Sequence, residues 1–320
     1  MHIPFQIRRT ALAASAVTAA VLAASCGGDT TVSLGGGDYE VNIKPAFAGT
    51  VANTTYDGTS DDLLTAGLGR TGLAGAAPAL SATPTAVELR KLAIHTNYRA
   101  ILDITAGGGY GTLYGPNVDV NGVAGTGEGR IAGTESIAYA DGGTGSQNVT
   151  MMVQVPSTFD PKNPCIVSAT SSGSRGVYGA IGSAGEWGLK RGCAVAYTDK
   201  GSGTGVHDLQ ANTVNAIDGR RGDAATLGTA SNFMARLSAA ERTAFNIATP
   251  GRFAVKHAHS EQNPEKDWGM HTLQAIEFAF WVLNERFGDA LPDGRRTKLI
   301  KPGNTLVIAS SVSNGAGAAL

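Results

Sequence analysis

The sequence predicts an α/β fold with a mostly parallel sheet, because strand-like and helix-like segments alternate over residues 126–320. Two short apolar runs, "CIVSATSS" from Cys165 and "CAVAYTDKG" from Cys193, have the length and composition of buried strands. A third run, "NTLVIAS", lies near the C-terminus and is followed by small residues that can begin a helix. Such alternation favours parallel strands joined by helices that cover the faces of the sheet.

An antiparallel hairpin is predicted ahead of these strands. Residues 130–140 and 148–156 are both rich in strand-forming residues, and they flank the turn-forming stretch "DGGTGSQ". The hairpin therefore adds two strands to the predicted sheet.

Helices are expected between the later strands. Residues 177–192 predict the first helix, and about 65 residues of loop and short helices follow the strand at Cys193. Residues 267–288 predict a long helix that ends at Gly288. The expected buried face of that helix carries Leu273, Ile276, Phe280, Leu283 and Phe287. The order of hairpin, strand, helix, strand, insertion, helix, strand, sharp turn and helix is the first half of an α/β-hydrolase plan, in which the last strand delivers the nucleophile.

Residues 26–125 are predicted to form a helical and loop extension in front of this catalytic domain. Its clearest helix lies in "TAVELRKLAIHTNYRAILDI", where Thr85 and Glu88 have the spacing of a capping box. "DDLLTAGLGRTGLAG" is a second helical patch, and "TAGGGYGTLYGPNVDVNGVAGTGEG" is expected to be a long glycine-rich loop.

Residues 1–25 have the features of a signal peptide. Arg8 and Arg9 precede about 15 small or apolar residues, a stretch that is short for a bilayer span. The following "LAASC" suits signal peptidase and also resembles an imperfect lipobox, with Leu22 one place too far from Cys26. We expect a secreted or periplasmic protein, with a lipid anchor on Cys26 at the outer-membrane surface as the alternative.

The cysteine pattern fits an exported protein. Cys165 and Cys193 each open a predicted strand at the same end of the sheet, so a disulfide between neighbouring strands is feasible. The alternative is two buried free thiols. A metal site is not expected: no CxxC pair is present, and His257 and His259 lack an evident third ligand.

The sharp turn after the last strand predicts a serine nucleophile. The pattern G-x-S-x-G appears here as Ser311-Val312-Ser313-Asn314-Gly315, with a small serine in place of the first glycine. Small residues flanking Ser313 would let the strand and the following helix approach closely. The alternative is that Ser313 only caps that helix.

Two loops are expected to supply backbone donors for an oxyanion. One donor is the amide of Asn314, directly after the serine, and the other lies in the loop after the strand at Cys165, at Ser172 or Gly173. A flexible turn is the alternative interpretation of that loop. The histidines at 207, 257, 259 and 271 all precede Ser313, whereas the base of this plan follows the nucleophile. We therefore expect the chain to be the N-terminal part of a longer protein, unstable and inactive alone.

At these residues the sequence resembles the D-(−)-3-hydroxybutyrate oligomer hydrolases. "NPCIVSATSSGSRGVYGAIGSAGEWGLKRGCAVAYTDKG", "FAVKHAHSEQNPEKDWG" and "SSVSNGAGAAL" carry the resemblance, which extends from about residue 40 to the end. It implies a secreted carboxylic ester hydrolase that cleaves short 3-hydroxybutyrate oligomers, derived from the storage polyester polyhydroxybutyrate, to monomers. It also implies that Ser313 is the active serine. Ala316 stands where we expect glycine, and Arg175 is a candidate for binding an oligomer's carboxylate.

Other functions are less well supported by the sequence. The net charge is −1 and no basic stripe is present, so nucleic acid is not an expected partner. No phosphate-binding motif is found, and no cofactor is expected. A tannase- or feruloyl-type esterase and a non-enzymatic exported binding protein remain the alternatives.

Overall fold

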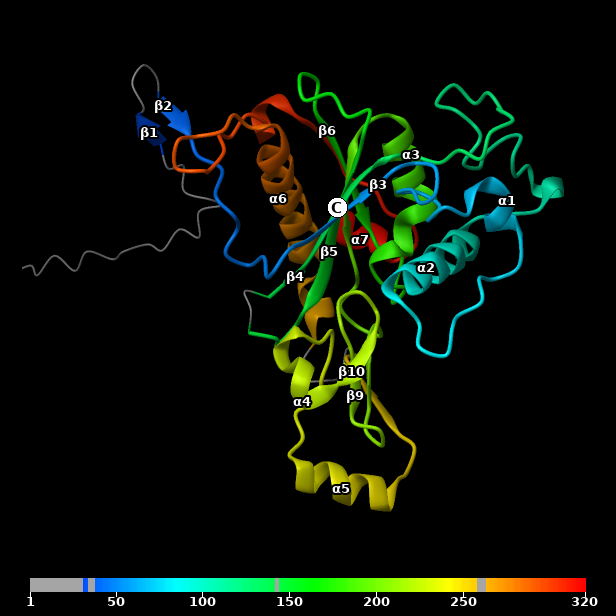
Figure 1. Cartoon of the computed structure of the whole chain (residues 1–320), viewed down its shortest axis with the longest axis vertical. Helices are drawn as coiled ribbons and strands as arrows, with labels where there is room; N and C mark the ends of the chain where they lie inside the picture. Colours follow the sequence, from blue (N-terminus) through cyan, green and yellow to red (C-terminus); the bar gives the residue numbers. More distant parts are fainter. Residues whose placement is uncertain (1–30, 34–37, 142–143, 258–262) are drawn as a thin grey trace, which may run out of the picture.

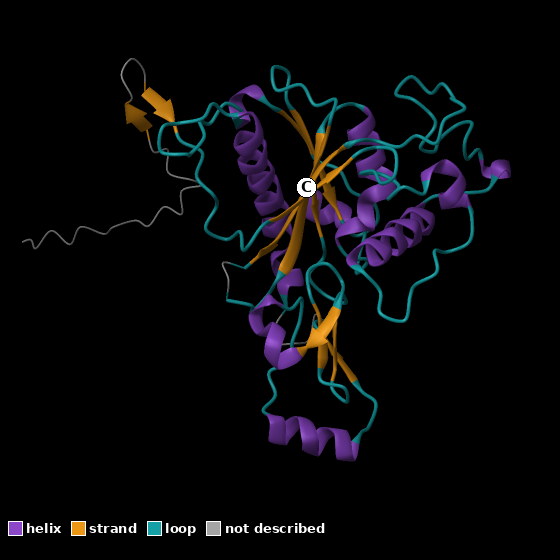
Figure 2. Ribbon diagram, in the orientation of Figure 1, coloured by secondary structure: helices purple, strands orange, loops and turns teal. Residues whose placement is uncertain are grey.

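A six-stranded sheet forms the centre of the protein. The computed structural model describes residues 31–33, 38–141, 144–257 and 263–320. The strands of this sheet run in the order β12-β6-β7-β5-β4-β3. Their bounds are β3 Ala52–Tyr56, β4 Gly133–Ala140, β5 Val149–Pro156, β6 Cys165–Thr170, β7 Ala194–Thr198 and β12 Leu306–Ile308. Figures 1 and 2 show the sheet at the middle of the molecule, between helices on both sides.

The sheet is mixed, so the expectation of a mostly parallel sheet is wrong. β12, β6 and β7 are parallel to one another, whereas β5 is antiparallel to both β7 and β4, and β3 is antiparallel to β4. The parallel strands are those joined by crossover connections that contain helices. Such a connection returns the chain to the end of the sheet where the previous strand began, so that the next strand runs in the same direction. The antiparallel strands come from the predicted hairpin and from β3, which lies in the N-terminal extension.

Helices cover the two faces of this sheet unequally. α6 (Trp268–Phe287) packs on one face, while α2 (Ala86–Ile101) and α3 (Glu186–Lys190) lie on the other. The predicted buried face of α6 is wrong in part, because Leu273 is 62% exposed. The side chains of α6 that pack on the sheet include Ala275, Phe278, Ala279, Val282 and Leu283.

The segment predicted as one helix over residues 177–192 is divided into three short turns. A 3₁₀ turn spans Val177–Ala180, a π turn spans Ile181–Gly185, and α3 follows. Glycines in this segment pack closely: a Cβ on Gly182 would lie 3.2 Å from a ring carbon of Tyr98, and one on Gly185 would lie 2.3 Å from the hydroxyl of Tyr197. These contacts explain why the segment is rich in glycine and poor as a regular helix.

The insertion between β7 and α6 contains a second sheet that the sequence did not indicate. Its four strands run in the order β10-β9-β8-β11, and each has three residues. The bounds are β8 Val206–Asp208, β9 Thr213–Asn215, β10 Arg221–Asp223 and β11 Phe253–Val255, with helices α4 Ala224–Leu227 and α5 Ala239–Ala248. Figure 1 shows this unit projecting from one end of the central sheet, with α5 at its tip.

The helices α1 (Gly69–Ala74) and α2 of the N-terminal part pack against the face of the sheet that carries α3. The capping box predicted for α2 is confirmed, since the side chain of Thr85 accepts from the Glu88 amide and Glu88 accepts from the Thr85 amide. The N-terminal part also contains a 3₁₀ turn at Ala106–Gly108, whereas β1 Thr31–Ser33 and β2 Asp38–Glu40 lie on the side of α6 (Figure 1). Among the described helices, none has the length and apolar character needed to cross a membrane.

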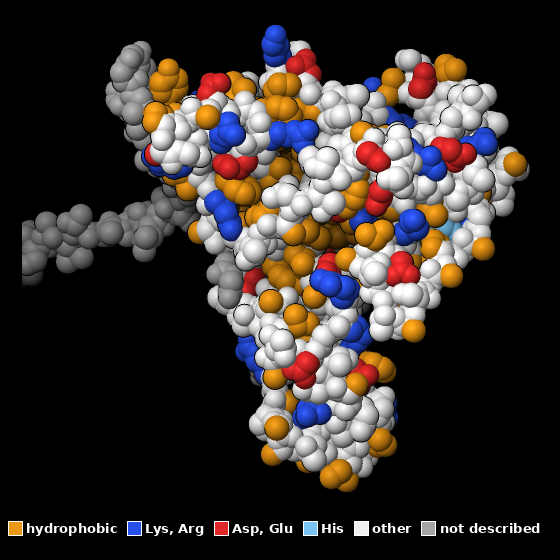
Figure 3. Space-filling model, in the orientation of Figure 1, with side chains coloured by type: hydrophobic (Ala, Val, Ile, Leu, Met, Phe, Trp, Pro, Cys, Tyr) orange, Lys and Arg blue, Asp and Glu red, His pale blue; other side chains and the backbone are white. Residues whose placement is uncertain are grey.

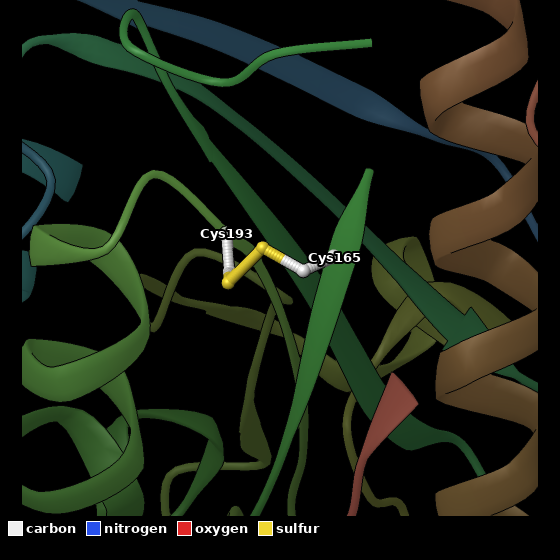
Figure 4. The surroundings of a disulfide bond; sticks show 2 residues. All are labelled: Cys165 and Cys193. Carbon is white, nitrogen blue, oxygen red and sulfur yellow. A yellow bond between two sulfur atoms is a disulfide. The ribbon is translucent and has the colours of Figure 1, made fainter. Parts of the chain in front are cut away.

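A disulfide joins Cys165, the first residue of β6, to Cys193, which directly precedes β7. The sulfur atoms of Cys165 and Cys193 are 2.06 Å apart, and their Cα atoms are 4.8 Å apart (Figure 4). This is the disulfide that the positions of Cys165 and Cys193 make feasible, in place of two free thiols. The bond lies at the amino ends of β6 and β7, opposite to the loops that leave their carboxyl ends.

Removing this bond is expected to lower the free energy of unfolding by about 3–4 kcal/mol, because it closes a loop of 28 residues. Chemical denaturation of the Cys165→Ala, Cys193→Ala double variant measures the loss. A reductant should destabilise the parent protein by a similar amount and leave the double variant unchanged. Equal sensitivity of both proteins to the reductant would show that the bond has no stabilising role.

Candidate active site

Ser313 lies at the apex of a sharp turn between β12 and α7 (Gly315–Ala319). It has a φ of 57°, in the left-handed region that non-glycine residues seldom adopt. The residue is exposed. Strained backbone of this kind clusters at functional sites, where the surrounding structure holds it in place.

The residues two before and two after Ser313 allow this turn to form. A Cβ on Gly315 would lie 2.3 Å from the backbone oxygen of Ser171 and 2.4 Å from Oγ of Ser311, so only glycine fits there. Ser311, which replaces the first glycine of the motif, donates its hydroxyl to the Thr170 carbonyl at 2.9 Å. The turn is thus packed directly against the carboxyl end of β6.

Substituting Gly315 by alanine is expected to displace this turn. The new Cβ must push away a backbone oxygen, which should lower the free energy of unfolding by about 1–3 kcal/mol. A displacement of about 1 Å at the nucleophile should reduce kcat by about 100-fold.

Gly317→Ala is the matched control, because a Cβ at Gly317 meets no atom within 4 Å. It should retain kcat and stability, as measured by ester turnover and denaturation. Equal behaviour of the two alanine variants would contradict the tight packing at Gly315.

The loop after β6 lies beside the turn. A Cβ built on Gly173 would be 3.6 Å from Oδ1 of Asn314. The carbonyl of Gly173 accepts from Oγ of Ser171 at 2.7 Å and from the amide of Arg175 at 2.8 Å, which fixes the loop. The structure therefore brings together the two segments that were predicted to supply oxyanion donors.

Several donors in these segments have no acceptor within the described part of the chain. The backbone amides of Ser172, Gly173 and Asn314 make no hydrogen bond to a described residue. Oγ of Ser172 is buried and also lacks a partner among those residues. Unpaired donors beside an exposed serine are what an oxyanion site requires.

The position of the turn in the sheet agrees with a binding site. β6 and β12 are neighbouring parallel strands. The chain leaves β6 toward the face covered by α3, whereas α7 lies near α6 on the opposite face, with the Ala318 carbonyl close to Gly269. Ligands of open α/β sheets bind at such switch points, outside the carboxyl ends of the strands.

The side chain of Ser313 does not act as a helix cap. The N-cap of α7 is Asn314, and no side-chain capping bond is present there. Oγ of Ser313 has no hydrogen-bond partner in the described part of the protein.

The rings of His207 and His271 are both held by other groups. Nδ1 of His207 accepts from the Ala235 amide, Nε2 faces Asn212, and burial lowers the pKa of this ring. His271 lies between the side-chain oxygens of Gln274 and Gln147. His259 lies outside the described residues. The described residues thus provide no hydrogen-bonded base for Ser313.

Two aspartates that follow β7 differ in their surroundings. Asp199 is buried, and burial raises the pKa of its carboxyl, although the nearby Lys256 opposes this effect. Asp208 accepts from the amides of Gln210 and Ala211, as a turn former does.

No described group of three or more His, Cys, Asp or Glu side chains is placed to hold a metal ion. A surface cavity of about 600 Å³ lies between the N-terminal part and α3, with a lining that includes Asn117, Arg130 and Lys190. No residue of the turn at Ser313 contributes to it. On the face seen in Figure 3, positive and negative side chains are interspersed, without a continuous basic patch.

Comparison with known proteins shows the family to which the chain belongs. The model of the family described as 3HB-oligomer hydrolase (3HBOH) matches residues 21–320. The chain is 67% identical over 316 residues to a D-(−)-3-hydroxybutyrate oligomer hydrolase of Albidiferax ferrireducens, covering 98% of this chain and 44% of that protein. It is 66% identical over 317 residues to the protein with the same description from Polaromonas naphthalenivorans, again covering 98% of this chain and 44% of that protein.

The similarity remains high in other genera. The Cupriavidus metallidurans protein of that description is 57% identical over 98% of this chain and 43% of its own length. The chain thus spans less than half the length of these relatives. No solved structure matches the chain.

Proposed function

Because the chain belongs to the 3HB-oligomer hydrolase family, we propose that it carries the nucleophile of an enzyme that hydrolyses short oligomers of D-3-hydroxybutyrate to monomers. The relatives named above are described as hydrolases of these oligomers. The observation that carries the proposal is the left-handed backbone of exposed Ser313, at the end of a strand and beside unpaired amides.

In the proposed mechanism, Oγ of Ser313 attacks the carbonyl carbon of the ester, and its proton passes to a base. The negative charge that develops on the carbonyl oxygen is stabilised by the amides of Asn314 and of Ser172 or Gly173. The C–O bond to the alcohol then breaks, and the alcohol leaves with a proton. Water attacks the resulting acyl-serine, which releases the acid and restores the serine hydroxyl.

We propose an α/β-hydrolase-like fold for the catalytic domain. The hairpin β4–β5, the parallel strands β6, β7 and β12, and the helices between them follow the order of that plan. The nucleophile lies after the last of these strands, and the loop after β6 lies next to it. The base and its acidic partner are proposed to lie outside the described residues.

A direct comparison of substrates tests the function. We call the protein in its catalytically competent form, with the proposed base and acid in place, the active protein. The active protein should hydrolyse the 3-hydroxybutyrate dimer and should not hydrolyse galloyl or feruloyl esters. Preference for the aromatic esters would favour a tannase- or feruloyl-type esterase. Binding without turnover of any ester would favour an exported binding protein.

We also propose that the protein is exported. A disulfide between Cys165 and Cys193 is compatible with an oxidising compartment, where such bonds persist. The mass of the mature N-terminus separates the two modes: cleavage before Cys26 with a diacylglycerol adduct indicates an anchor, and an unmodified N-terminus indicates free secretion.

A further inference from the structure

Arg175 is the only charged residue in the two segments that form the site. Residues 165–185 contain no other charged side chain, and residues 304–320 contain none. These two segments thus contribute small, neutral residues and one cation to the site. A substrate that carries a negative charge close to its reacting bond would meet a single complementary group.

The position of Arg175 is fixed by the loop that carries the proposed oxyanion donors. Its amide donates to the Gly173 carbonyl at 2.8 Å. Only one residue, Ser174, lies between Gly173 and Arg175, so the Cα atoms of these two residues are at most about 7.6 Å apart. A Cβ on Gly179 would lie 3.2 Å from Cβ of Arg175, so the base of the side chain rests against that glycine.

The guanidinium of Arg175 is available to a ligand. The residue is exposed, and no ion pair joins it to another of the residues that the structure describes. The neighbouring cations differ in this respect. Lys200 is paired with Glu265 at 2.7 Å, and Lys256 is buried.

The chemistry of the proposed substrate supplies a matching anion. A linear hydroxybutyrate oligomer has a hydroxyl at one end and one free carboxylate at the other. Within the last two units, the reacting ester carbon and the carboxylate carbon are separated by four bonds, which span about 5 Å when extended. The carboxylate then belongs to the alcohol that leaves, never to the acyl group held by the serine.

We propose that Arg175 binds the terminal carboxylate of the oligomer, so that the enzyme removes monomers one at a time from the carboxyl end. This inference rests on the proposed function. A guanidinium can bind a carboxylate through two parallel hydrogen bonds, which fixes the orientation of the ligand as well as its charge. The ester carbonyl nearest the carboxyl end is then the one presented to Ser313.

The first test measures binding without turnover, in a Ser313→Ala background. Calorimetry compares the dimer acid with its methyl ester, which lacks the charge. Arg175→Gln should weaken binding of the acid about tenfold and leave binding of the methyl ester unchanged. Arg191→Gln is the control, because Arg191 is exposed and lies before the amino end of β7, away from the carboxyl ends of the strands. This substitution should change the affinity for neither ligand. Equal effects of Arg175→Gln on both ligands, or no effect on the acid, would overturn the inference.

The second test follows the products of a trimer whose carboxyl-terminal unit carries an isotopic label. The first monomer released by the active protein should carry the label, and label appearing first in the dimer would overturn the inference. Failure of the proposed function looks different. If Ser313→Ala retains full turnover of the dimer methyl ester, the serine mechanism fails. If turnover of the dimer acid is serine-dependent but its KM is unchanged by Arg175→Gln, only the carboxylate inference fails.

Discussion

Replacing Ser313 by alanine is expected to lower kcat for the 3-hydroxybutyrate dimer by about 10⁴-fold or more in the active protein, in line with the loss of other serine nucleophiles. The substitution removes only the attacking oxygen. Folding and substrate binding should therefore be retained, and thermal unfolding together with dimer binding provides the check.

Ser310→Ala is the control for this prediction. Ser310 lies two residues after the end of β12, and its amide, which the substitution keeps, donates to Oγ of Ser168. The variant should retain turnover. A Ser313→Ala protein with more than about a tenth of the parent kcat would show that another group attacks the ester.

Replacing Glu135 by glutamine is expected to lower the free energy of unfolding by about 3–5 kcal/mol. The substitution removes one of the two carboxylates that compensate the buried guanidinium of Arg90. Glu135 and Arg90 are both buried, with 3.2 Å between Oε2 and Nη2. The second partner of Arg90 is Asp61, at 3.0 Å. Urea denaturation measures the loss.

The same network reaches the loop beside the active site. The hydroxyl of Tyr178, three residues after Arg175, donates to Glu135 at 2.9 Å. Burial and the charge of Glu135 raise the pKa of Tyr178, so this hydroxyl remains a donor. The N-terminal helix α2, which carries Arg90, thus supports the segment that follows the proposed oxyanion loop.

An exposed ion pair provides the matched control for Glu135→Gln. Asp293 and Arg295 lie 2.5 Å apart, with nearly half of each side chain exposed. Asp293→Asn should cost far less stability than Glu135→Gln, because solvent screens an exposed ion pair. Similar losses in the two variants would show that burial does not govern the contribution of the Glu135 pair.

The strands of the central sheet were predictable from the sequence because their signals are strong. Five of the six are β-rich runs bounded by turn-forming residues, and the hairpin has a clear turn between its halves. Their directions were less predictable. β5 is antiparallel to β7, although the two strands are separated by β6 in the sequence, and no local pattern encodes that pairing.

The features that the sequence did not reveal have weak local signals. The insertion's strands have three residues each, too short for an alternating pattern to stand out. α6 has apolar residues around much of its surface, so its periodicity does not select the buried face, and Leu273 was misplaced for that reason.

The candidate site was predictable where it depends on residue size. Small residues around Ser313 after a strand indicate a tight turn, and Gly315 indicates a close approach of backbone. The closeness of Gly173 to Asn314 could not be deduced, because it depends on β12 lying beside β6. The hydrogen bond from Ser311 to Thr170, which explains the serine in place of glycine, likewise depends on tertiary structure.

The most direct test of this account is to locate the nucleophile chemically. The active protein is treated with a fluorophosphonate until ester hydrolysis stops, and the modified peptide is identified by mass spectrometry. We predict one adduct, on Ser313, and no adduct in the Ser313→Ala variant. An adduct on a different residue of the fully inhibited protein would contradict the assignment.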